Sequence, residues 1–373
     1  MRVVLATGSY ADTPGPLAAA VSLAQGWARH APADQVIVAP LSDGGSGFVE
    51  VLAHALDVQP TPVVVTGPTG ADVPAQLLLH EGSAYIEAGQ AAGRHLAVEA
   101  LQEALVPAGA SSEEADRSAA ALTSLTSRGV GELIAAALEA GATRIVLGCG
   151  DLASHDGGRG LLQALGAGED LTELPAVRDR LRGTTLVLAH ATTLPLTGFH
   201  GASAALGTEH GVPAVVTQRL EEEMGLLTER ITRILPARKD LLTGKPLRPE
   251  RTEGAGVGGG VGYAAILLGA TPVVGASFVI EQVGLVDVLP GALLVTGGEA
   301  YDYRTVHDGV IAEAAQAALE VGTPSIVLAQ RIEVGRREGM SLGVSGAYDP
   351  RVGEDLADLA ERVARTWSPR HGD

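Results

Sequence analysis

A short pattern that could do chemistry occurs twice in this chain: an aspartate, two glycines, one variable residue and a third glycine. The two copies are DGGSG at residues 43–47 and DGGRG at residues 156–160. Glycines allow backbone amides to approach a phosphate closely, and a helix that begins after such a loop adds the positive end of its dipole. The leading aspartates, Asp43 and Asp156, could hold Mg²⁺ or accept a proton from a hydroxyl group. The pattern therefore indicates a nucleotide or phosphate site.

Two more glycine-rich segments, residues 254–262 and 296–299, also adjoin predicted strands or helices. Loops at the carboxyl ends of parallel strands are where open α/β sheets bind ligands, so the four loops together favour a ligand site. A local alternative stays open for each loop, because an aspartate can hydrogen-bond its own backbone while glycines adopt positive φ. That alternative would make each loop a tight turn without a ligand.

Other motifs give weaker signals. Residues 254–259 match the G-x-G-x-x-G pattern, but the preceding LRPERTE does not resemble a strand, so a dinucleotide-binding oxidoreductase is the weakest alternative. The single cysteine, Cys149, excludes an internal disulfide and a cysteine-cluster metal site, and we expect a buried thiol. Among the ten histidines, His155 and His190 stand beside these loops, and a structural role is favoured for both.

The charge balance limits the partners of this chain. Its 373 residues include 26 Lys and Arg against 44 Asp and Glu, a formal net charge of -18, which argues against nucleic-acid and anionic-membrane partners. Residues 255–280 carry no charge, but glycines and Pro272 interrupt them, so we expect buried core there and no membrane span. The first apolar run is too short for a secretory signal, which favours a cytoplasmic protein.

The pattern of predicted elements indicates an α/β protein with two domains. Up to about residue 57 the chain alternates strand, helix, strand and helix, which implies a parallel sheet. Residues 61–93 instead combine β-rich pieces with glycine turns, the pattern of antiparallel hairpins. The α/β alternation returns from about residue 127. The Pro- and Arg-containing residues 237–254 are the best candidate for a crossing between domains, followed by a helix and then by TPVVGASFVIE as a strand.

The ordered segments resemble the type I glycerate kinases, which phosphorylate D-glycerate with ATP. The resemblance covers nearly the whole chain and rests on these segments: RVVLATGSY, SDGGSGFVEVL, VTGPTG, RGVGELIAAALEAGATRIVLGCG, ASHDGGRGLLQALGA, GFHGASAALG, EGAGVGGGVGYAAILLGA and LLVTGGEAYD. It implies a discontinuous flavodoxin- or Rossmann-like parallel-sheet domain at residues 1–60 plus about 255–373. A swivel-like mixed α/β domain, about residues 61–254, would be inserted within it.

Several family residues are replaced in this chain. The family's A-P-D-S-F-K reads ATGSYA at residues 6–11, so the acid and the lysine are lost while Ser9 remains. The family's T-G-E-G-R-I-D reads TGGEAYD at residues 296–302, without the arginine. Losing one donor of transition-state stabilisation commonly costs about 10²–10³ in rate. Nearby arginines, namely Arg128, Arg159 and Arg304, could substitute.

The resemblance implies ATP and Mg²⁺ as cofactors and a glycerate-like hydroxy acid as the substrate. Asp43 and Asp156, expected in one cleft, would hold the metal or orient the acceptor hydroxyl, and Arg159 is the best replacement for a missing cation. The expected phosphate-binding residues are Ser9, Gly44, Gly45, Gly157, Gly158, Gly256, Gly258 and Gly297. Phosphoryl transfer, impaired or intact, is the favoured function. The alternative is a non-catalytic metabolite- or nucleotide-binding pseudoenzyme on the same scaffold, and a homodimer is left open.

Overall fold

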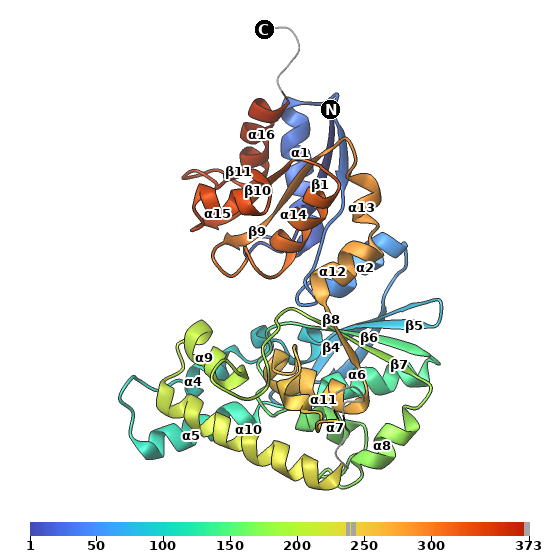
Figure 1. The fold of residues 1–373 in the computed structure, drawn as a ribbon, viewed down its shortest axis with the longest axis vertical. Helices are drawn as coiled ribbons and strands as arrows, with labels where there is room; N and C mark the ends of the chain where they lie inside the picture. The colour runs from blue at the N-terminus through green and yellow to red at the C-terminus, as the bar shows by residue number, and fades with distance from the viewer. Residues whose placement is uncertain (236–238, 240–243, 369–373) are drawn as a thin grey trace. The chain divides into compact units, whose positions relative to one another are not determined.

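The computed structural model describes residues 1–235, 239 and 244–368, and the chain divides into two compact units (Figure 1). Unit 1 comprises Met1–Val58 and Gly275–Asp373, and unit 2 comprises Gln59–Val274. Unit 1 is thus built from both ends of the chain, and unit 2 is continuous. The predicted α/β class is confirmed, and each unit has its own sheet and its own core.

Unit 1 contains a five-stranded parallel sheet with the order β11-β10-β9-β1-β2. Its strands are β1 (Arg2–Thr7), β2 (Gln35–Val38), β9 (Leu293–Tyr301), β10 (Ser325–Ile332) and β11 (Val344–Tyr348). Counted along the chain within this unit, the order is 2-1-3-4-5, the flavodoxin-like arrangement. The direction of winding reverses between β1 and β9. Ligands of such sheets bind at the carboxyl ends of these two strands.

Helices cover both faces of the unit 1 sheet. One face packs against α1 (Pro16–His30) and α16 (Leu356–Trp367), which lie side by side in Figure 1. The close approach of these two helices requires Gly26, because a Cβ there would lie 1.9 Å from the Ala357 carbonyl oxygen. The remaining helices are α2 (Phe48–Leu56), α12 (Gly275–Gln282), α13 (Leu285–Val288), α14 (Val310–Glu320) and α15 (Arg336–Ser341). Of these, α14 packs on β9, and α12 contacts both α2 and α14.

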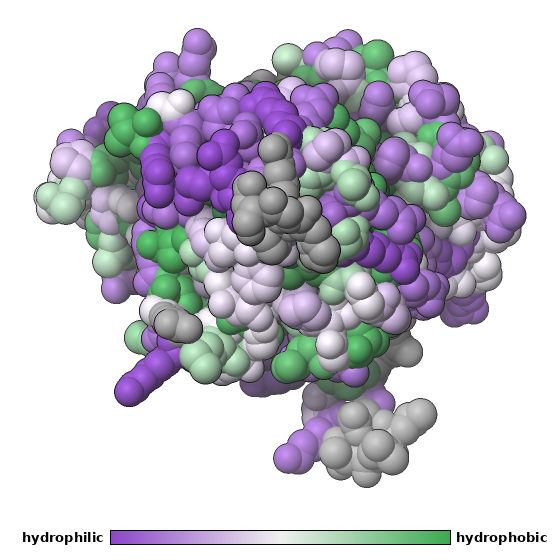
Figure 2. Space-filling view, turned by 90° about the horizontal axis from the view of Figure 1, so that it is seen from above, coloured by the Kyte–Doolittle hydropathy of each residue, from purple (hydrophilic) through white to green (hydrophobic). Residues whose placement is uncertain are grey.

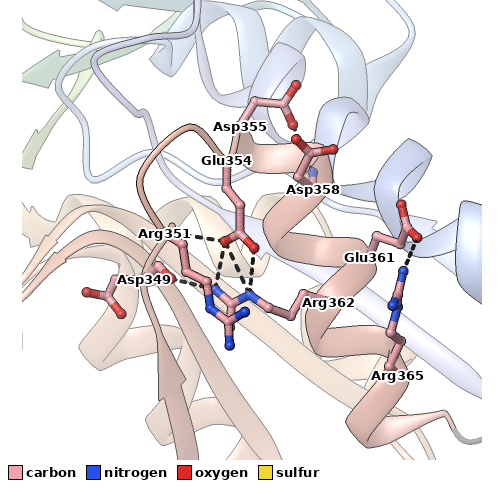
Figure 3. Close-up of polar contacts among 8 residues, drawn as sticks. All are labelled: Asp349, Arg351, Glu354, Asp355, Asp358, Glu361, Arg362 and Arg365. Atoms are coloured by element: carbon pink, nitrogen blue, oxygen red, sulfur yellow. Dashed lines mark hydrogen bonds and ion pairs between the residues drawn. The ribbon is translucent and has the colours of Figure 1, made fainter.

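A polar network secures the start of α16 (Figure 3). The Arg362 Nε and Nη2 atoms donate to Glu354 Oε1 and Oε2 at 2.9 and 3.0 Å, and Nη2 also donates to the Asp349 carbonyl at 2.7 Å. The Arg351 amide donates to Glu354 Oε2 at 2.9 Å. The network therefore ties the loop before α16 to the helix itself.

Unit 2 contains a six-stranded mixed sheet with the order β3-β4-β5-β6-β7-β8. Its strands are β3 (Thr61–Thr66), β4 (Asp72–His80), β5 (Ser83–Glu87), β6 (Arg144–Cys149), β7 (Thr185–His190) and β8 (Thr271–Val274). The first three strands pair antiparallel, which confirms the predicted hairpins, and β5 to β8 pair parallel. The β4–β5 turn uses Glu81 and Gly82, both at positive φ, as a tight two-residue hairpin turn requires.

The helices of unit 2 form two groups. The sheet packs with α6 and α11 in the main core, and a second cluster unites α4, α5 and α10. The helices are α3 (Gly89–Ala92), α4 (Val98–Ala104), α5 (Ser112–Ser124), α6 (Arg128–Glu139), α7 (Arg159–Ala164), α8 (Leu174–Arg180), α9 (Ala202–His210), α10 (Ala214–Ile234) and α11 (Val261–Leu268). Short 3₁₀ turns are η1 (Arg94–Leu96), η2 (Pro249–Arg251) and η3 (Val257–Gly260).

The structure differs from the sequence-based expectation at the second boundary between the units. The chain passes from unit 2 to unit 1 at residues 274–275, and not near residue 255, because α11 lies in the unit 2 core and β8 pairs with β7. The segment expected as one strand is β8 followed by α12, whose apolar Phe278 packs on Phe48 of α2. The expected crossing at residues 237–254 lies partly outside the described residues, and its described part belongs to unit 2.

On the face in Figure 2, hydrophilic side chains predominate and hydrophobic ones are scattered among them. In the part of the chain that the structure describes, no helix is both long enough and apolar enough to cross a membrane.

Candidate functional site

The first aspartate–glycine loop connects β2 to α2 in unit 1. Asp43 Oδ1 accepts a hydrogen bond from the Gly45 amide at 2.9 Å, and Ser42 Oγ accepts one from the Gly44 amide at 3.3 Å. Gly44 and Gly47 have φ values of 97° and 78°, which side-chain-bearing residues rarely adopt. The loop thus has the self-bonded turn geometry that was the local alternative, and it holds the Asp43 carboxyl at the start of α2.

The Asp43 carboxyl has a perturbed proton affinity. Burial raises its pKa above the usual value, while hydrogen bonds from the Gly45 and Asp43 amides and the charge of Arg304 act in the opposite direction. A carboxyl whose pKa is raised toward the working pH is better matched to proton transfer than an ordinary aspartate. Asp43 therefore has the properties of a general base or acid.

The starts of three helices gather around this loop. A Cβ on Gly275, the first residue of α12, would lie 1.9 Å from the Asp43 carbonyl oxygen, so the two backbones touch. The Ser277 hydroxyl in α12 donates to Glu313 in the first turn of α14. A Cβ on Gly8, just after β1, would lie 3.5 Å from Val310 at the start of α14. Helix N-termini attract anions, so this edge of the unit 1 sheet suits phosphate groups.

Ser9 follows β1 by two residues, and Gly297 lies in the middle of β9, where it pairs with Thr7 at the end of β1. The Glu299 amide donates to the Ser9 carbonyl at 3.1 Å, and Glu299 Oε2 accepts from the Ala11 amide at 2.8 Å. A Cβ on Gly297 would lie 1.7 Å from the Leu328 carbonyl oxygen, so close strand packing explains this glycine. The Ala11 amide is thus occupied by the protein's own Glu299, a residue that the sequence analysis did not single out.

The second aspartate–glycine loop lies in unit 2, between β6 and α7. Asp156 is only 4% exposed, and its carboxylate accepts four hydrogen bonds. The donors are the Ser127 amide (3.0 Å) and hydroxyl (2.9 Å) and the amides of Gly158 and Gly160 (both 2.9 Å). Because Ser127 precedes α6 and Gly160 lies in the first turn of α7, Asp156 joins the starts of two helices. This geometry gives Asp156 a positioning role.

The glycines beside Asp156 pack against the glycine segment at residues 254–262. The Gly157 amide donates to the Gly259 carbonyl at 3.0 Å, and a Cβ on Gly158 would lie 2.6 Å from the Gly260 carbonyl oxygen. Gly256 and Gly258 are also confined. A Cβ on Gly256 would lie 2.3 Å from the Pro195 carbonyl oxygen, and a Cβ on Gly258 would lie 2.6 Å from a Leu152 methyl group. Contact between protein segments therefore explains why these positions are glycine.

The other side chains around this loop have distinct roles. Arg159 is the exposed first residue of α7. His155 is buried, and its Nε2 lies 3.1 Å from the Ser203 hydroxyl at the start of α9. Burial lowers the pKa of His155 to about 4, so the imidazole is neutral near pH 7. Burial also raises the pKa of the Cys149 thiol, which fits the expected unreactive cysteine.

The described residues contain no group of three or more His, Cys, Asp or Glu side chains placed to hold a metal ion. This does not conflict with the expected Mg²⁺, which commonly binds through one or two carboxylates, substrate phosphates and water. Asp43 lies in unit 1, whereas Asp156 and Arg159 lie in unit 2, so their sharing one site stays a prediction.

Comparisons with known proteins agree with this fold. The profile of the glycerate kinase family matches residues 3–367. A Bacillus subtilis protein named glycerate kinase is 30% identical over 395 residues, which cover 98% of this chain and 96% of the relative. Escherichia coli glycerate 2-kinase is 30% identical over 352 residues, covering 88% and 85%. A solved structure from Salmonella typhimurium LT2, described provisionally as glycerate kinase 2, is 28% identical with a TM-score of 0.70 and covers 98% of each chain. This chain belongs to the glycerate kinase family.

Proposed function

We propose that this protein transfers the terminal phosphoryl group of ATP to a hydroxyl group of D-glycerate or a closely related hydroxy acid, with Mg²⁺, in the cytoplasm. The family match over residues 3–367 and the relatives named glycerate kinases support this reaction. The comparisons give no support to the non-catalytic alternative.

The observation that carries the proposal is the Asp43 carboxyl, which has a raised pKa and lies where three helix N-termini gather. In the reaction, the substrate hydroxyl oxygen forms a bond to phosphorus, the bond from phosphorus to ADP breaks, and the hydroxyl proton moves to Asp43. Positive charge must offset the negative charge of the transferring group. The helix N-termini supply part of it in unit 1, and Arg159 is the candidate cation in unit 2.

The metal roles follow from the same arrangement. When bound, Mg²⁺ would neutralise the phosphate charge and would be held mainly by phosphate oxygens and water, because a carboxylate bound to the metal could not also accept the hydroxyl proton. Asp156 would contribute by fixing the loop that presents Arg159, because its own oxygens already accept four hydrogen bonds.

An assay that couples ADP release to D-glycerate addition tests the proposal. We expect the wild type to turn over and Asp43→Asn to lower kcat by about 10²–10⁴-fold, the usual contribution of general acid–base catalysis. Arg159→Ala should also lower kcat, whereas Arg182→Ala, an exposed arginine of the same unit, should not. Absence of glycerate-dependent ADP release by the wild type would refute the function.

A further inference from the structure

A second polar cluster lies in unit 2, outside the aspartate–glycine loop. It contains Arg94, Asp151 and His210. Arg94 follows α3 after the end of β5, and Asp151 comes two residues after the end of β6. Since β5 and β6 are parallel neighbours, both side chains belong to the carboxyl edge of the sheet, where α/β proteins bind ligands.

Backbone contacts hold the first two members together. Gly93 forms a β-bridge with Leu152, and the Ala153 amide donates to the Ala92 carbonyl at 2.8 Å. Arg94 and Asp151 each adjoin a residue of that bridge. The segment carrying Arg94 is therefore fixed against the loop carrying Asp151.

The third member comes from α9, which lies along the same loop. The first turn of α9 carries Ser203, whose hydroxyl contacts His155, and its last residue is His210. His210 Nε2 lies 3.2 Å from Asp151 Oδ2. Both ends of α9 thus contact the loop at residues 151–155, which gives His210 a defined position.

The contacts within the cluster leave its hydrogen-bonding capacity only partly used. The Arg94 Nε to Asp151 Oδ2 distance is 3.6 Å, too long for a hydrogen bond. The buried His210 Nε2 has no hydrogen-bond partner, because its approach to Asp151 lacks hydrogen-bond geometry. A buried polar nitrogen left in this way costs free energy, so the groups of this cluster that remain open to a ligand are Arg94 and Asp151.

The exposure of the three side chains suits a small ligand. The side chains of Arg94 and His210 are 28% and 22% exposed, so solvent only partly screens them, while Asp151 is 52% exposed and open to a partner. A guanidinium binds a carboxylate through two parallel hydrogen bonds, and a carboxylate such as Asp151 accepts hydrogen bonds from hydroxyl groups. A molecule carrying one carboxylate and neighbouring hydroxyl groups matches this set.

We propose that Arg94, Asp151 and His210 form the recognition site for the hydroxy-acid substrate, with Arg94 binding its carboxylate and Asp151 accepting from a hydroxyl group. His210, whose Nε2 lies 3.2 Å from Asp151 Oδ2, positions the Asp151 carboxylate. This proposal rests on the proposed function for the identity of the substrate, D-glycerate. It also supplies a cation for the substrate carboxylate in a chain that lacks the lysine and arginine of the family pattern.

The test compares Arg94→Gln with Arg182→Gln, which removes another aspartate-paired arginine of unit 2 whose side chain is 81% exposed. Arg94→Gln should raise the KM for D-glycerate about tenfold or more, as expected for a lost charge-assisted hydrogen bond, and leave the KM for ATP unchanged. Calorimetry should show that Arg94→Gln loses affinity for glycerate by the same factor. The ratio of its affinities for glycerate and glycerol should fall as well. Asp151→Asn should instead reduce the preference for glycerate over propionate. Arg182→Gln should change none of these quantities.

The outcomes separate this inference from the proposed function. The recognition site is overturned, while glycerate kinase activity stands, if Arg94→Gln leaves the KM for glycerate unchanged. It is also overturned if Arg94→Gln changes the KM for glycerate and the KM for ATP equally and lowers the unfolding temperature. If the wild type releases no ADP with glycerate, the proposed function fails. The site is then tested by calorimetry with lactate and other small hydroxy acids, and absence of binding by all of them overturns it.

Discussion

Asp43 and Asp156 begin the same five-residue pattern, yet the two units use them differently. In unit 1 the Asp43 carboxyl bonds chiefly within its own turn, and burial raises its pKa. In unit 2 the Asp156 carboxylate accepts four hydrogen bonds that join the starts of α6 and α7. A carboxylate with all its donors supplied by the protein stabilises the fold, whereas one with a perturbed pKa is suited to chemistry. Local sequence alone does not distinguish these roles.

The largest expected difference concerns stability. Asp156→Ala leaves four buried donors without their acceptor, which should cost about 3–5 kcal/mol of unfolding free energy, whereas Asp43→Ala should cost about 1 kcal/mol or less. Both tryptophans, Trp27 and Trp367, lie in unit 1, so their fluorescence reports on that unit. Urea unfolding of Asp156→Ala should therefore show a circular-dichroism transition that precedes the fluorescence transition. A larger loss for Asp43→Ala would reverse the comparison.

His155 of unit 2 and Asp43 of unit 1 should also respond to acid in opposite directions. His155 has a folded pKa of about 4 and an unfolded pKa near 6.5, so stability is lost as pH falls from about 6.5 to 4, by up to about 3 kcal/mol. Asp43 has a folded pKa above its unfolded value, so its contribution becomes more favourable as pH falls toward that unfolded value. Unfolding of wild type and His155→Gln across pH 4–8 measures the first effect. Equal pH dependence of the two proteins would contradict it.

A pair of alanine substitutions sharpens the comparison at the backbone. Gly275→Ala would place Cβ 1.9 Å from the Asp43 carbonyl oxygen, and Gly259→Ala would place it 2.1 Å from the Ser154 carbonyl oxygen. Each overpacking should cost about 1–3 kcal/mol. Gly275→Ala should also reduce kcat, because it displaces the Asp43 loop. If Gly259→Ala reduces kcat more than Gly275→Ala, unit 2 contributes more to the chemistry than we propose.

The smallest effect provides a baseline away from both loops. Glu354 and Arg362 form a two-point ion pair at the start of α16 (Figure 3). A double-mutant cycle with Glu354→Gln and Arg362→Met should give a coupling of about 1 kcal/mol, as for an ion pair near the surface. A coupling as large as the loss in Asp156→Ala would show that the Asp156 bonds are not exceptional.

Much of the fold could be predicted from the chain. The strand–helix alternation up to about residue 57 and the glycine-turn hairpins of residues 61–93 are local signals, and the structure contains them where predicted. The boundary between the units was missed because residues 272–280 are mostly apolar and carry no charge, so periodicity did not separate β8 from α12. That boundary depends on the pairing of β8 with β7, which is a tertiary contact.

The candidate site was less predictable. The residue types pointed to Asp43 and Asp156, but not to the donors that surround Asp156, since Ser127 is 29 residues away in sequence. The confinement of Gly256 and Gly258 by Pro195 and Leu152 likewise comes from segments distant in sequence. Arg94 and His210 belong to no motif, and only the packing of α9 along the loop after β6 brings them to Asp151.

The split construction of unit 1 has a consequence for synthesis on the ribosome. The inner strand β1 emerges first, but its neighbour β9 emerges only after all of unit 2. The Tyr10 hydroxyl donates to the carbonyl of Leu328, 318 residues later. Unit 2 is continuous and can complete its sheet while the nascent chain is still growing. Strand β1 can pair with β2 meanwhile, but its other edge lacks β9 until unit 2 has been made, and such exposed strand edges are prone to aggregation. Translation speed and chaperone supply should therefore limit the correct folding of unit 1 more than the folding of unit 2.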